Sequence, residues 1–189
     1  MKRGLVTLGV LLGLSLHTQA RAAEHDSRHV SLTLSPIHLI FPIVEAQVEL
    51  LVVPHFSVAA IGGVGSIAAK SNDPVVDGQR FSVQEVGGQI VGYPLREFSS
   101  LQLGAEVLWV HVATKLLAGQ EISGKASGVA FGPFAGYKLI TSGGFTFFVQ
   151  GGFEYESVTA HATDTTGTNA HDQKSGFIPL LNLNIGWSF

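Results

Sequence analysis

Hydrophobic and polar residues alternate along much of the chain, and the last stretch shows this pattern most clearly. From Leu181 to Phe189 the odd positions are Leu, Leu, Ile, Trp and Phe, while the even positions are Asn, Asn, Gly and Ser. A period of two residues is that of a β-strand with one apolar and one polar face. The stretch 176–189 is therefore predicted to be a strand that closes on an aromatic residue.

The same alternation, less regular in places, predicts seven further strands. Their expected ranges are 30–35, 43–53, 56–69, 81–93, 100–114, 127–139 and 145–160. The apolar link 37–41 lies between two prolines and is assigned to no element. After the second strand, short turns at 54–55, 94–99 and 140–144 alternate with longer polar segments at 70–80, 115–126 and 161–175.

Composition narrows the class of protein. Charged residues make up 13% of the chain, against about 25% in a typical soluble domain, while 46% are hydrophobic and 23 are Gly. The chain has no Cys, which excludes both disulfides and a lipoprotein anchor. This combination is typical of a cell-envelope protein that folds without disulfides.

The first 22 residues have the features of a secretory signal peptide. Lys2 and Arg3 precede an apolar run from Leu5 to Leu16, and small residues at Ala20 and Ala22 fit cleavage after Ala22. The apolar run is too short for a transmembrane anchor, which needs about 20 residues. We therefore expect one domain, residues 23–189. Cleavage would lower its formal charge from −3 to −6, which disfavours binding to nucleic acid.

Eight alternating strands and the closing sequence Leu-Asn-Leu-Asn-Ile-Gly-Trp-Ser-Phe resemble the small eight-stranded outer-membrane barrels of the OmpA/OmpX-like type. The resemblance covers residues 30–189 and rests on architecture, not on a functional motif. It implies an all-β, eight-stranded antiparallel up-and-down transmembrane β-barrel in a Gram-negative outer membrane, in contact with lipid and lipopolysaccharide. It also implies that the barrel-assembly machinery reads Trp187 and Phe189. Both termini would lie in the periplasm and the three long polar segments outside the cell.

Two other folds compete with this interpretation. Residues 50–69 carry no formal charge apart from His55 when it is protonated, and hydropathy alone could assign them to a transmembrane helix. Pro54 and the glycines at 62, 63 and 65 disfavour that helix. A water-soluble sandwich or lipocalin-like barrel would show the same alternation with its apolar face inside, and alternation cannot tell inside from outside.

If the barrel spans a membrane, its polar face is the lumen. An eight-stranded barrel is just wide enough for side chains to fill it, so we expect a hydrogen-bonded polar core. The alternative is a narrow cation-preferring path, because acidic residues exceed basic ones on this face. The predicted lumen residues, with Lys138 as the clearest base, are Glu45, Gln47, Glu49, Glu85, Gln89, Gln102, Glu106, Gln150, Glu154, Asn182 and Asn184.

Candidate chemistry outside the lumen is sparse, and we expect no catalytic residue and no cofactor. Lipid A deacylase barrels use a His with a Ser two residues on, whereas His111 is followed at that spacing by Ala113. The Gly62–Ser66 run lacks the Lys and the strand-to-helix context of a phosphate-binding loop. Loop residues His161, Asp164, His171 and Asp172 could bind a metal, but ordinary solvated polarity explains them better.

A metal site is not expected, and the weak candidate is His25. Cleavage after Ala22 would leave Ala23-Glu24-His25 as the new N-terminus. A free amine, two amide nitrogens and an imidazole at position three suit the tetragonal geometry of Cu(II) or Ni(II).

The sequence thus predicts a barrel with a structural or surface-recognition role through its extracellular loops and without catalysis. The alternative function is a narrow cation-preferring or small-solute channel.

Overall fold

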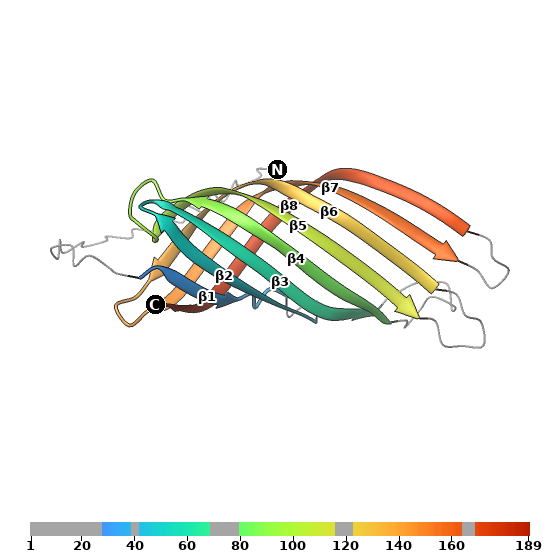
Figure 1. Cartoon of the computed structure of the whole chain (residues 1–189), viewed down its shortest axis with the longest axis horizontal. Coiled ribbons are helices and arrows are strands. Elements are labelled where there is room, and N and C mark those ends of the chain that lie inside the picture. Colours follow the sequence, from blue (N-terminus) through green and yellow to red (C-terminus); the bar gives the residue numbers. More distant parts are fainter. Residues whose placement is uncertain (1–27, 39–41, 69–79, 116–122, 164–168) are drawn as a thin grey trace, which may run out of the picture.

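The computed structural model describes residues 28–38, 42–68, 80–115, 123–163 and 169–189. Each strand pairs antiparallel with the next, and β8 pairs with β1 to close the barrel (Figure 1). The strands are β1 (Val30–Leu34), β2 (Ile43–Val53), β3 (Phe56–Ala68), β4 (Arg80–Gly92), β5 (Ser100–Lys115), β6 (Ser123–Ile140), β7 (Phe145–Thr163) and β8 (Asn169–Ser188). The predicted all-β, eight-stranded antiparallel up-and-down barrel is confirmed. The predicted signal peptide and His25 lie outside the described residues.

The strands end at nearly the same height at one end of the barrel and at different heights at the other. The tight connections 54–55, 93–99 and 141–144 lie at one end, called here the turn end, together with the start of β1 and the end of β8. Strand length rises from 5 residues in β1 to 20 in β8. Because the turn end is level, the extra length of β5 to β8 projects at the opposite, open end, beyond the ends of β1 and β2 (Figure 1).

Most polar strand side chains lie inside this barrel and most large apolar ones lie outside, although a smaller apolar cluster is also buried inside. On β2, Glu45, Gln47 and Glu49 are buried, whereas Val48 and Leu50 are exposed. Exposed large apolar side chains occur on all eight strands. This is the inverse of a water-soluble barrel, so the lipocalin-like alternative is wrong.

The outer surface carries two bands of aromatic residues. On β7, Phe145 and Tyr155 are ten residues apart, as are Trp187 and Phe177 on β8. Ten residues rise roughly 33 Å along a strand, and a tilt of about 45° reduces this to about 23 Å along the barrel axis. The band at the turn end comprises Phe56, Tyr137, Phe145, Trp187 and Phe189, and the other band comprises Trp109, Phe131, Phe153, Tyr155 and Phe177.

The predicted ranges are closest where one face is apolar and fail where both faces are polar. β2 has the predicted bounds. The expected loop 161–175 is wrong, because β7 continues to Thr163 and β8 begins at Asn169, paired throughout. The expected loop 115–126 is also shorter than predicted, because β5 continues to Lys115 and β6 begins at Ser123. The helix alternative for 50–69 is also wrong, since these residues form the end of β2, a turn and β3. Among the described residues, no helix is long and apolar enough to span a bilayer.

Phe189 closes the barrel through its backbone. Its carbonyl oxygen accepts hydrogen bonds from the amides of His29 (2.8 Å) and Val30 (3.2 Å), and its own amide donates to the Val30 carbonyl (2.8 Å). These bonds extend the ladder between β8 and β1 by one residue at the seam where the first and last strands meet.

We therefore expect deletion of Phe189 to lower the yield of folded barrel in lipid vesicles more than Phe189→Ser does, since deletion removes the backbone bonds as well as the ring. Phe189→Tyr keeps both and is the matched control. The measurement is the fraction of protein whose gel migration changes on boiling. Equal folded fractions for the deletion and the wild type would contradict this role of the seam.

Candidate functional site: the barrel lumen

The turn end of the lumen contains a buried ion pair. Lys138 on β6 places its Nζ atom 2.7 Å from Oε2 of Glu49 on β2, and neither side chain is more than 1% exposed. The other carboxylate oxygen, Oε1, accepts hydrogen bonds from the hydroxyls of Ser57 and Tyr93. The Tyr93 oxygen in turn accepts a bond from Gln102 Nε2 (3.0 Å). Both charges are therefore compensated, as a buried pair requires.

The connection between β4 and β5 covers this ion pair. Phe98 is 3% exposed, and its ring centroid lies 3.6 Å from Lys138 Nζ. Phe98 has a φ of 59°, a left-handed conformation that a bulky residue adopts only where its surroundings hold it. Burial, together with the Glu49 carboxylate, raises the pKa of the Tyr93 phenol, so this hydroxyl remains a donor. The lumen is thus closed at the turn end by Lys138, Glu49, Tyr93 and Phe98.

Hydrogen-bonded amides cross the middle of the lumen. Gln47 donates to Gln89 (3.2 Å), and Gln89 donates to Gln150 (3.1 Å) and to the Glu106 carboxylate. Gln150 then donates to Gln102 (3.1 Å). This network joins β2, β4, β5 and β7 across the barrel, and β8 joins it through Asn182 and Asn184.

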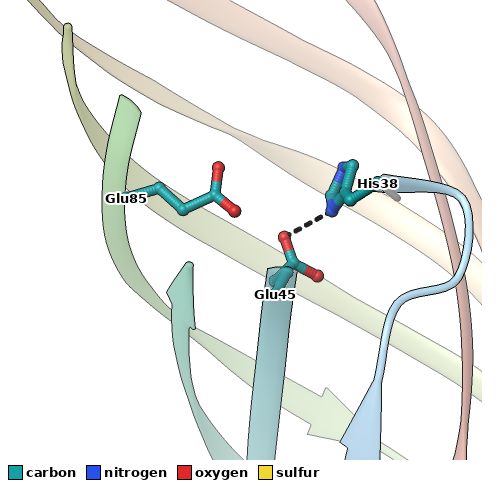
Figure 2. A group of neighbouring side chains, drawn as sticks. All are labelled: His38, Glu45 and Glu85. Atoms are coloured by element: carbon teal, nitrogen blue, oxygen red, sulfur yellow. Dashed lines mark ion pairs between the residues drawn. The ribbon is translucent and has the colours of Figure 1, made fainter. Parts of the chain in front are cut away.

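The third cluster lies toward the open end and contains His38, Glu45 and Glu85. Nδ1 of His38 is 2.8 Å from Oε2 of Glu45. Each residue offers a ligand atom within 4.8 Å of the others, and Figure 2 shows all three side chains converging. The adjacent Glu45 carboxylate raises the pKa of His38 above its ordinary value, since it favours the imidazolium form. An imidazole and two carboxylates are the donor types that divalent transition metals accept.

The structure places every predicted lumen residue inside the barrel. Glu85 and Asn182 are half-buried. The buried residues are Glu45, Gln47, Glu49, Gln89, Gln102, Glu106, Lys138, Gln150, Glu154 and Asn184. Sequence reasoning missed His38 and Phe98, because both lie in connections where no period marks an inward face. It also missed Tyr93, which ended the predicted strand 81–93 but lies just after the end of β4.

Residues considered for other chemistry do not assemble into a site. The His111 ring stacks on Trp109, with centroids 5.7 Å apart. Gly62 and Gly63 lie within β3. In the former loop, His161 is paired opposite His171 in the β7–β8 ladder and Asp172 is exposed, while Asp164 lies outside the described residues.

Comparison with known proteins gives only a distant likeness. The sequence matches no family model and no curated protein. Among solved structures, the fold is similar to a major outer membrane protein from Thermus thermophilus, with 12% identity and a TM-score of 0.46. The match covers 87% of this chain and 100% of the Thermus chain. A likeness this distant carries no information about what the chain binds, and the resemblance to OmpA/OmpX-like barrels stays a prediction.

Replacing Lys138 by Met should lower the free energy of unfolding by about 3–5 kcal/mol, because it leaves the Glu49 carboxylate buried without its cation. The double variant Lys138→Met/Glu49→Gln removes both charges and should recover most of this loss. Urea unfolding in lipid vesicles measures both variants. A double variant no more stable than Lys138→Met would contradict the assignment of the loss to an uncompensated charge.

Proposed function

We propose that this chain is an outer-membrane β-barrel with a sealed lumen and a structural or surface-recognition role. The observation that carries the proposal is the occlusion of the lumen, closed at the turn end by Lys138, Glu49, Tyr93 and Phe98 and crossed by bonded amides above them. A filled interior leaves the outer wall and the projecting strands as the surfaces available for function.

The exposed apolar wall supports placement in a membrane. Water-soluble monomers rarely expose contiguous apolar patches larger than a few hundred Å², whereas this barrel exposes large apolar side chains on every strand. Outer-membrane barrels carry an apolar band about 25 Å tall between two aromatic girdles, close to the separation of about 23 Å derived above from strand rise and tilt. We infer that lipid and lipopolysaccharide contact this band.

The proposed orientation follows from the asymmetry of the two ends. Outer-membrane barrels have short periplasmic turns and longer extracellular extensions, so the turn end would face the periplasm. The wall beyond the second aromatic band would then lie outside the cell. Its exposed polar side chains include Lys125 and His161 on the outer face and Asp172 and Lys174 on the lumen face, and a polar projecting wall suits contact with a soluble or surface partner.

A cation path is the second candidate, and one observation favours it. Glu45, Glu85, Glu106 and Glu154 all lie in the lumen, and acidic rings favour cations. Conduction would require the Lys138–Glu49 pair and the ring of Phe98 to move aside. We therefore rank this function second.

A non-catalytic role and recognition of Trp187 and Phe189 by the assembly machinery complete the proposal. His111 has an aromatic neighbour and no nucleophile two residues on, which supports the absence of deacylase chemistry. Trp187 packs edge-on against Phe145, with centroids 5.8 Å apart, and its indole donates to the Gly143 carbonyl (2.9 Å). These contacts hold the closing strand against β7 and the turn before it.

In planar bilayers, the wild type should give no steady conductance, since side chains fill the lumen. Glu45→Gln and Glu106→Gln variants are the controls for cation selectivity and should be equally silent. Steady cation-selective currents in the wild type that vanish in these variants would favour the channel instead.

Orientation can be tested with introduced thiols, because the chain has no Cys. Gln173→Cys on the exposed part of β8 should react with a membrane-impermeant maleimide in intact cells. Ser142→Cys, exposed in the turn between β6 and β7, is the matched control and should react only after the cells are permeabilised. The reverse labelling pattern would overturn the proposed orientation.

A further inference from the structure

The open end of the lumen brings together three side chains whose arrangement has no evident part in closing the barrel. His38 follows β1, Glu45 lies near the start of β2, and Glu85 lies on β4 (Figure 2). We propose that His38, Glu45 and Glu85 bind a divalent transition-metal ion. This proposal is independent of whether the lumen conducts.

The distances suit such an ion. Zinc bonds to nitrogen and carboxylate oxygen at about 2.0–2.2 Å in tetrahedral geometry, so two of its ligand atoms lie about 3.3–3.6 Å apart. The ligand atoms of the three residues already lie within 4.8 Å of one another. Small side-chain rotations are therefore enough to complete the coordination.

The backbone around Glu85 is shaped to admit its carboxyl group. Gly63 on β3 is paired directly opposite Glu85, and a Cβ atom added at Gly63 would collide with the Glu85 carboxyl oxygen and carbon. The absence of a side chain at this one position lets the Glu85 carboxyl lie against β3 and face the other two ligands.

One of the candidate ligand atoms lacks an ordinary partner. Among the described residues, buried Oε1 of Glu85 makes no hydrogen bond, whereas Nδ1 of His38 is paired with Glu45. Buried polar atoms are normally satisfied. An unsatisfied carboxylate oxygen beside an imidazole and a second carboxylate points to a bound species between them.

The charge of the surrounding side chains indicates that the bound species is a cation. Glu45 is 5% exposed, and a buried carboxylate is costly unless it is paired or coordinates a metal. Lys138 cannot neutralise this charge, because it forms an ion pair with Glu49 at the opposite end of the lumen. Glu106, by contrast, accepts bonds from Gln89 and Asn182. Glu154 adds a further buried carboxylate, with an oxygen that is unbonded within the described part of the chain, so the excess negative charge extends along the lumen around the site. His38, with 26% of its side chain exposed, leaves a route of entry.

The test uses the full mature chain without a His tag, folded in lipid vesicles and titrated with Zn²⁺ by calorimetry. We expect one site in the wild type, with affinity at least tenfold weaker in His38→Ala and in Glu85→Gln. Gly63→Ala should also weaken binding, because it displaces Glu85 without removing a ligand. Glu154→Gln, which alters a buried lumen carboxylate outside the triad, is the matched control and should bind as the wild type does. Boiling-dependent gel migration verifies that each variant is folded.

Three results would overturn the proposal. The first is a wild type that binds no Zn²⁺ while folded, which would indicate that Glu45 and Glu85 share a proton instead. The second is Zn²⁺ binding unchanged in His38→Ala and Glu85→Gln but lost in His25→Ala, which would place the metal at the N-terminus. The third is tighter binding of Ca²⁺ or Mg²⁺ than of Zn²⁺, which would exclude a transition-metal site.

Discussion

The inward orientation of the polar face of each strand is the constraint on which this structure depends. Once carboxylates and amides are enclosed, each must find a partner across the lumen, because a buried polar group without one costs more free energy than its hydrogen bond contributes. Eight strands bring opposite walls close enough for direct contact. The Gln89 amide thus reaches Gln150 on β7 across the lumen, as well as Glu106 on the neighbouring strand β5.

The two ends of the lumen satisfy this constraint in different ways. At the turn end, Glu49 has a lysine, a tyrosine and a serine, and Phe98 covers the pair. Toward the open end, Glu45 is paired with an imidazole and lies close to the Glu85 carboxyl group, which has an oxygen without a hydrogen bond from any described residue. The first cluster is complete with protein atoms alone, whereas the second is complete only with an added cation or proton. This contrast separates a closure from a candidate binding site.

The sequence predicted the elements whose two faces differ. β2 and the closing strand alternate strictly, so their faces and the inward position of Glu45 and Glu49 followed from a period of two. The first part of β8 could not be predicted in this way. Its residues are polar on both faces, as in Asp172, Gln173, Lys174 and Ser175, so no period of two appears there. His38 could not be predicted either, because its position depends on how the link after β1 turns into the lumen.

The sequence alone could not show which face of each strand points into the barrel, because the alternation is the same when the two faces are exchanged. What distinguishes them physically is contact with lipid, and the chain offers a direct probe. Its two tryptophans, Trp109 and Trp187, are exposed on opposite aromatic bands. Measuring the quenching of their fluorescence in vesicles, with lipids brominated at different depths and with Trp109→Phe and Trp187→Phe to separate the signals, tests the account most directly. We predict strong quenching of each by lipid brominated near the interface and weak quenching by aqueous iodide. Quenching of both by iodide, with no effect of brominated lipid, would contradict an outward apolar face in a membrane.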